Sequence, residues 1–267
     1  MTRQTQPLDY IFATGRIRAL EKFLISQTVF EEAIAADLGS VLRLFVESDL
    51  YTDELLHVKD SRQLEEVLEE ELARLKGLMA ELILDKHLLM MLEADEIGGI
   101  EEVLKSCRSA FLKDYLRHLI DMYNLKVFLR LYILKEPQEK LSAQVKCQGF
   151  IPIGELLKLY PQDLAALLNR LEYVPKHYGI LDYTYYLGEA IQRTVKENLF
   201  LYLEKAMNDF LMQILKEAKY IAFGPEPVLA YYFAKANEIN LIRMIILGKL
   251  NNFPRDLVEE RLNAVYA

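Results

Sequence analysis

Apolar residues recur at helical spacing along most of the chain, and the longest such pattern lies between residues 60 and 92. Its members step by three or four positions and therefore share one helix face: Leu64, Leu68, Leu72, Leu75, Met79 and Leu82. Acidic residues occupy the opposite face, and Asp60-x-x-Gln63 has the capping-box pattern of a helix start. The segment predicts one long helix with a coiled-coil-like seam.

Similar patterns predict further helices, which begin at residues that favour helix termini. Long helices are expected over residues 9–25, 107–135 and 192–219, another beginning at Gly224-Pro225, and a last one at Pro254. Shorter helices are expected from the Thr28-x-x-Glu31 capping box and from Pro161. No segment alternates convincingly between apolar and polar residues, so the predicted fold class is all-α.

One helical pattern occurs three times. Residues 122–130 and 238–246 both place Asn-Leu at the entry of an apolar helix that carries a basic residue, and residues 14–20 resemble them more weakly. Near-equal steps separate the three copies, which is typical of internal repeats. We therefore expect three pseudo-repeated helical modules, at residues 1–59, 60–178 and 179–267.

Charge and composition narrow the possible functions. The formal net charge of −8 disfavours general nucleic-acid binding. Apolar residues make up 52% of the chain, enough for a continuous core, and the two cysteines are expected to be free thiols. No uncharged apolar stretch is long enough to span a bilayer, and the first residues form no apolar leader. Any membrane association is therefore expected to run through a protein partner or a surface contact.

Motifs that would indicate catalysis are missing, since the sequence has no Gly-rich phosphate loop, HExxH, GxSxG or paired CxxC. Asp114, His118 and Asp121 stand at i, i+4 and i+7, a spacing that places three metal-ligand side chains on one helix face. Without a fourth ligand nearby, a solvated and charge-paired face explains them better. We expect no catalytic centre, no cofactor and no metal.

The run from Phe223 to Pro254 has a distinctive pattern: Gly-Pro-Glu-Pro, then Ala-Lys, a Glu before Asn, Arg, Gly-Lys-Leu-Asn and Pro. This pattern resembles the end of the V/A-type ATPase C subunit, called d in eukaryotic enzymes. Residues 10–24 are similar to the N-terminal helix of that family, and residues 121–126 resemble its internal Asp-x-x-Asn-x-Lys step. Family members are usually longer than this chain.

The resemblance implies a fold of three similar helical modules arranged as a funnel with approximate threefold symmetry. It also implies a peripheral position on the cytoplasmic face of the membrane, on the proteolipid ring, with the central-stalk subunits of D and F type as further partners. The membrane stator subunit is an additional candidate partner. Such a subunit transmits torque during ion transport and performs no chemistry. A helical-repeat scaffold of another complex is the alternative function.

Six basic residues recur near the repeated step and are the candidates for partner contact: Arg16, Arg18, Lys126, Arg130, Arg243 and Lys249. Basic side chains can guide docking, although an exposed ion pair adds only about 0–1 kcal/mol. The alternative role for each of them is a cap or a salt bridge to a neighbouring helix.

Overall fold

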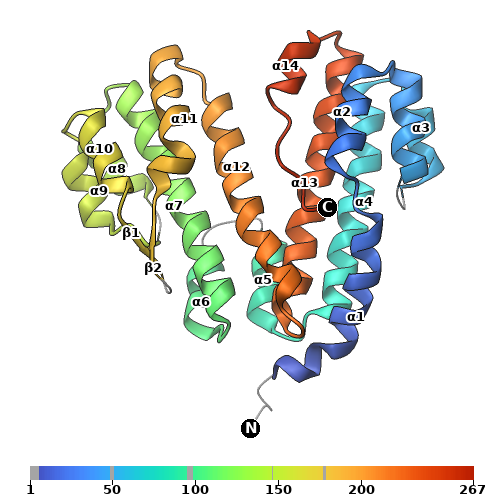
Figure 1. Ribbon diagram of the computed structural model, residues 1–267, viewed down its shortest axis with the longest axis horizontal. Helices are drawn as coiled ribbons and strands as arrows, with labels where there is room; N and C mark the ends of the chain where they lie inside the picture. The colour runs from blue at the N-terminus through green and yellow to red at the C-terminus, as the bar shows by residue number, and fades with distance from the viewer. Residues whose placement is uncertain (1–5, 49–50, 95–98, 146, 177–178) are drawn as a thin grey trace. The chain divides into compact units, whose positions relative to one another are not determined.

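The computed structural model describes residues 6–48, 51–94, 99–145, 147–176 and 179–267, which form helices joined by short connections (Figure 1). The chain divides into two compact units. Unit 1 comprises Met1–Leu89 and Met212–Ala267, and unit 2 comprises Met90–Leu211. The boundaries between the units fall inside α5 (Lys86–Ala94) and α12 (Leu201–Lys216).

Unit 1 combines segments from both ends of the chain. Its elements are η1 (Pro7–Tyr10), α1 (Ile11–Leu20), η2 (Glu21–Phe23), α2 (Gln27–Ala35), α3 (Leu38–Ser48), η3 (Asp53–His57), α4 (Ser61–Leu82), η5 (Glu217–Tyr220), α13 (Pro225–Leu250) and α14 (Arg255–Glu259). Helix α13 packs along α4 and α1 (Figure 1) and is buried on several sides, which explains why its apolar residues surround the helix. Phe30, Phe45, Leu68 and Ile242 join α2, α3, α4 and α13 in one core.

Unit 2 contains the second long apolar helix. Its elements are α6 (Ile100–Ser106), α7 (Ala110–Ile133), α8 (Gln138–Gln144), α9 (Ile153–Leu159), α10 (Leu164–Leu171), β1 (Val174–Lys176), β2 (Gly179–Leu181) and α11 (Tyr183–Glu197). Leu125 of α7, Leu187 of α11 and Leu203 of α12 are fully buried. Strands β1 and β2 form an antiparallel pair, with Val174 opposite Leu181. They are the only strands in the described ranges, and the predicted all-α class is confirmed.

Capping by side chains decides where the segment 60–92 starts and breaks. The predicted start is confirmed, because Asp60 Oδ1 accepts from the Gln63 backbone N–H at 2.9 Å and Gln63 Oε1 accepts from Lys59 N–H at 2.9 Å. The prediction of one helix to residue 92 is wrong. Helix α4 ends at Leu82, and Asp85 Oδ1 accepts from the His87 N–H at 2.9 Å, so α5 begins there as a separate helix.

Other predicted boundaries are also wrong. The residue preceding α2 is Ser26, in extended conformation, so Thr28 already lies inside the helix. Pro161 lies between α9 and α10, and α10 is instead capped by Asp163, whose side chain accepts from the Ala166 N–H. The segment 107–135 begins with α7 only at Ala110, after the Ser109 cap. The segment 192–219 is interrupted because Asn198 adopts φ 57°, in the left-handed region, and ends α11.

The second and third sequence repeats end in the same local structure. In α7, the Glu136 N–H donates to Leu131 O at 3.0 Å, and Lys135 has φ 55°. In α13, the Phe253 N–H donates to Gly248 O at 2.8 Å, and Asn252 has φ 53°. Both ends thus form a Schellman motif, and a proline then precedes the short helix α8 or α14.

Asn252 lies 117 residues after Lys135 (252 minus 135), so the two motifs align α13 with α7 in a register of 117 residues. The sequence copies that begin at residues 122 and 238 are 116 residues apart. The first copy differs, since α1 continues into the 3-10 helix η2 and then into extended Leu24. The described residues therefore show this motif twice. The threefold arrangement and the division at 1–59, 60–178 and 179–267 stay predictions, and residue 178 lies outside the described residues.

Candidate partner-binding surfaces

The six predicted contact residues lie on three helices, with four residues in unit 1 and two in unit 2. Arg16 and Arg18 are on α1, Lys126 and Arg130 on α7, and Arg243 and Lys249 on α13. Each of them contacts another residue of its own unit. These internal contacts agree with the alternative role, in which basic residues join neighbouring helices. Their part in partner contact stays a prediction.

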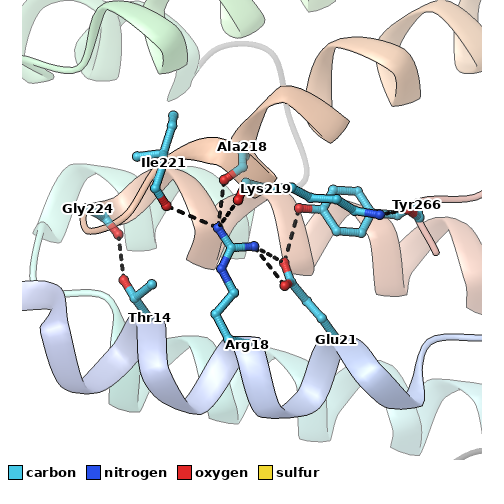
Figure 2. A network of polar contacts seen from close by, with 8 residues as sticks. All are labelled: Thr14, Arg18, Glu21, Ala218, Lys219, Ile221, Gly224 and Tyr266. Carbon is cyan, nitrogen blue, oxygen red and sulfur yellow. Dashed lines mark hydrogen bonds and ion pairs between the residues drawn. The ribbon is translucent and has the colours of Figure 1, made fainter.

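Arg18 connects α1 to the segment that precedes α13 (Figure 2). Its guanidinium donates to both carboxylate oxygens of Glu21, at 2.7 and 2.8 Å. It also donates to three backbone oxygens, those of Ala218, Lys219 and Ile221, at 2.8 to 3.1 Å. Glu21 in turn accepts from the Tyr266 hydroxyl at 3.1 Å. Arg18 therefore supplies a charged donor to carbonyl groups at the end of η5 and just after it, and Ala218 O also accepts from the Ile221 N–H.

Lys126 and Arg243 hold equivalent places in the two long helices, because they too are separated by 117 residues (243 minus 126). Lys126 forms an ion pair with Glu204 of α12. Arg243 Nε donates to both carboxylate oxygens of Glu65 of α4, at 2.9 and 3.1 Å. In each unit, the basic residue thus joins the long repeat helix to a second helix.

The remaining three residues differ in exposure. Arg16 pairs with Glu81 at 2.7 Å, and both side chains are largely exposed. Arg130 is exposed and lies over the ring of Phe200, 5.7 Å from its centroid. Lys249 donates to the Ile34 carbonyl near the end of α2, where a cation is stabilised by the helix dipole, and burial lowers the pKa of this lysine. Arg16 and Arg130 are accordingly the most accessible of the six.

Asp121 is the centre of a buried polar network in unit 2. Its carboxylate accepts from the backbone N–H groups of Phe150 and Ile151, at 3.0 and 3.1 Å, and from the Tyr183 hydroxyl at 2.9 Å. His118 Nδ1 lies 2.6 Å from the same hydroxyl. Burial raises the pKa of Asp121 to about 7, although its three hydrogen bonds act in the opposite direction. The network holds the connection before α9 and the start of α11 against α7.

Gly149 makes this approach possible. A Cβ atom at this position would lie 2.2 Å from Asp121 Oδ1 and 2.6 Å from Arg117 O, which is too close for any side chain. The loop can therefore reach the carboxylate only with glycine here.

Glu238 is the centre of an equivalent network in unit 1. It accepts from the Ile25 backbone N–H at 2.6 Å, from the Tyr51 hydroxyl at 3.1 Å and from Lys235 at 2.6 Å. The Lys235 ammonium also lies over the Tyr51 ring, 4.2 Å from its centroid. Burial lowers the pKa of Lys235, and the Glu238 carboxylate opposes that shift. The network attaches two segments to α13: the one that leads into α2, through Ile25, and the one that leads into η3, through Tyr51.

The predicted solvated face at Asp114, His118 and Asp121 is wrong for two of the three residues. His118 and Asp121 are buried, because α11 and the loop before α9 cover this side of α7, and only Asp114 keeps a loose pairing, with Arg117 at 3.8 Å. Within the described ranges, no three or more His, Cys, Asp or Glu residues are arranged to hold a metal ion. The hydrogen bonds of the two polar networks position loops against the long helices.

A cluster of exposed apolar side chains lies at one end of unit 1. Leu8, Ile11 and Phe12 follow one another at i, i+3 and i+4 and are 63%, 50% and 76% exposed. Leu84 and Phe223 are about half exposed, and hydrogen bonds join the segments that carry them to η1 and α1. We call these five residues the apolar end.

Two hydrogen bonds hold the three segments of the apolar end together. The Leu84 N–H donates to the Tyr10 hydroxyl at 3.1 Å, and the Thr14 hydroxyl donates to Gly224 O at 3.5 Å. Groups of exposed apolar side chains are typical of protein or membrane contact sites. This surface was not predicted from the charged positions, and the spacing of Leu8, Ile11 and Phe12 was the signal that could have indicated it.

Comparison with known proteins identifies the family. The family model described as ATP synthase (C/AC39) subunit matches residues 76–261, well over half of the chain. The C subunit of the V-type sodium ATPase of Enterococcus hirae is 28% identical over 148 residues, which cover 55% of this chain and 42% of that protein. The matched stretch thus spans less than half the length of this curated relative. In the part of the chain that the structure describes, no helix is both long and apolar enough to cross a membrane. The chain belongs to the family of V/A-type ATPase C subunits, the ATP synthase (C/AC39) subunit family.

Proposed function

We propose that this chain is a non-catalytic adapter in the central rotor of a V/A-type ATPase. In this role it links the soluble central-stalk subunits to the proteolipid ring at the cytoplasmic face of the membrane and transmits torque during ion transport. The observation that carries the proposal is the family match over residues 76–261.

The internal structure of unit 1 supports a mechanical role. Helix α13 has 26 residues, which corresponds to a length of about 39 Å at a rise of 1.5 Å per residue. It is packed against α4 and α1, Arg243 joins it to Glu65 of α4, and Glu238 joins it to Ile25, just before α2. Close-packed helices resist deformation, so a force applied at one end of α13 is transmitted along unit 1.

The apolar end supports a docking role. Five exposed apolar side chains would cost little to bury and would contribute to the area of about 1,600 Å² that a stable protein interface needs. Basic residues near the interface would act mainly on the rate and orientation of docking, since exposed ion pairs add little affinity.

The proposal is tested by affinity purification of the tagged full chain with the proteolipid ring, the D- and F-type stalk subunits and the membrane stator subunit produced together. We expect the ring and the stalk subunits to co-purify in fixed ratio. Recovery of none of them would refute the proposal and favour the alternative, a helical-repeat scaffold of another complex.

Two sets of variants separate the candidate surfaces. The double substitution Leu8→Ser with Phe12→Ser should weaken recovery of either the proteolipid ring or the stalk subunits. Leu134→Ser, at a position in unit 2 that is 62% exposed, serves as the control. Arg16→Gln with Arg130→Gln tests the accessible basic residues without removing the internal contacts of Arg18, Arg243 and Glu238. Unchanged assembly in this second variant would remove Arg16 and Arg130 from the predicted contact residues.

A further inference from the structure

An apolar groove of about 190 Å³ lies in unit 1, between the C-terminal half of α13 and α14. Its floor is formed by Met244, Leu247, Leu257 and Val258, and Phe253 lines it while remaining about half exposed. This volume accommodates one large apolar side chain. The groove is lined by the C-terminal half of α13, whereas Phe223 of the apolar end stands just before the N-terminus of that helix.

The groove also has a basic rim. Arg243 and Arg261 both line it, and none of its lining residues is acidic. Arg243 is paired with Glu65, but Arg261 forms no ion pair with any residue in the ranges that the structure describes. A carboxylate placed beside the groove would therefore meet a complementary charge.

The equivalent position in unit 2 has different chemistry, although the local fold is the same. In the 117-residue register, Leu247 and Leu257 correspond to Arg130 and Lys140, which are exposed. Val258 corresponds to Leu141, and both of these residues are buried. The Schellman motif and the short helix that follows therefore do not require an apolar groove. In unit 1, Leu247 and Leu257 supply apolar side chains where the equivalent residues of unit 2 are basic.

We infer that this groove binds a soluble partner protein, through a helical segment that inserts one large apolar side chain and places a carboxylate one turn away, toward Arg261. Residues one turn apart on a helix are about 5–6 Å from each other, a separation suited to a pocket and its rim. The inference rests on the proposed function, because it assigns the groove to the central-stalk subunits and leaves the apolar end to another partner.

The chain contains no tryptophan, so a single introduced tryptophan reports on its own surroundings. Phe253→Trp places the reporter at the groove. Tyr220→Trp places a control at a position that is 90% exposed, just before α13. Each full-length variant is titrated with the purified pair of D- and F-type stalk subunits, after correction for the stalk's own emission, and separately with the proteolipid ring in detergent. We expect the stalk pair to shift the emission of the Phe253→Trp variant to shorter wavelength and to leave that of the control unchanged.

Charge reversal provides the second measurement. Arg261→Glu should weaken stalk binding about tenfold or more, which corresponds to about 1.4 kcal/mol. Arg62→Glu is the matched control, because it makes the same charge change at an exposed position on α4. Circular dichroism of both variants establishes that they fold.

The outcomes are distinct. A stalk complex that forms at full strength without a shift in the Phe253→Trp variant overturns the inference and leaves the proposed function standing. A shift produced by the ring and not by the stalk also overturns it. If neither the stalk pair nor the ring binds the chain, the proposed function and the inference fall together.

Discussion

Asp121 and Glu238 occupy equivalent positions in the long helices of two different units, separated by 117 residues (238 minus 121). Each is a buried acid that accepts a backbone N–H from a distant loop and the hydroxyl of a tyrosine. One turn earlier stands His118 in one helix and Lys235 in the other, in the same register. The two units therefore attach their loops through equivalent buried acids. Because the residue one turn earlier differs, we expect the two networks to respond differently to removal of the acid and to a change of pH.

Glu238→Ala should destabilise unit 1 strongly. The substitution leaves the Lys235 ammonium buried without its counter-charge and the Ile25 N–H without its acceptor, so we expect a loss of about 3–5 kcal/mol. Urea unfolding followed by circular dichroism measures it. Arg62→Ala, which removes a largely exposed i, i+4 pair with Glu66, should cost less than about 0.5 kcal/mol. Similar losses in the two variants would contradict the assigned role of Glu238.

Asp121→Asn should change how the stability of unit 2 depends on pH. Burial raises the pKa of Asp121 to about 7 from its ordinary value of 3.8, so the folded state holds this proton where the unfolded chain has lost it. The resulting stabilisation is complete below about pH 4 and is lost as the pH rises through 7, with a slope of at most about 1.4 kcal/mol per pH unit.

Hydrogen exchange of unit 2 amides, corrected for intrinsic rates, measures this effect between pH 5 and 8. We expect the native chain to lose stability over this range and the Asn variant to lose less. The polar groups that act on residue 121 and on its partner are the same in both proteins: Tyr183, His118, Asp114 and Arg170. The difference in pH dependence between the two proteins therefore reports on the Asp121 carboxyl. Parallel pH profiles would show that Asp121 is ionised throughout.

Arg18→Met should cost about 2–3 kcal/mol, because it removes hydrogen bonds from a charged group to Glu21 and to three carbonyl oxygens, two of these bonds being partly buried. Arg16→Met is the matched control on the same helix. Its pair with Glu81 is largely exposed and should contribute only about 0–1 kcal/mol. The midpoints of urea unfolding compare the two variants, and equal midpoints would show that the Arg18 contacts add nothing.

Gly149→Ala should destabilise unit 2 by about 1–3 kcal/mol, because the new methyl group would displace the loop from Asp121. Gly77→Ala makes the same chemical change inside α4, where nothing lies within 4 Å of the new Cβ, and should stabilise the chain by about 0.5–1 kcal/mol. Thermal unfolding of both variants should therefore move in opposite directions. A Gly149 variant as stable as the native chain would mean that the loop reaches Asp121 in another way.

Sequence signals between neighbouring residues predicted the structure correctly where a feature depends on a single turn of helix. The Asp60 and Gln63 cap, the start of α13 at Gly224-Pro225 and the all-α class all depend on neighbouring residues, and the structure confirms them. The breaks after Leu82 and at Asn198 were missed because apolar periodicity continues across both of them. At those points a single residue that caps or adopts positive φ outweighs the pattern.

The sequence by itself determined that this chain is helical, that its family is that of V/A-type ATPase C subunits, and that one helical pattern recurs. Helix periodicity, caps and family motifs are local properties, so they can be recognised without knowing which segments meet. The tertiary structure alone decided which charged residues are joined: Arg18 meets Ala218, and Glu238 meets Ile25, across 200 and 213 residues of chain. It also decided that Asp121 is buried while Phe12 is exposed, because burial depends on which distant segment covers a residue and not on the residue's own spacing.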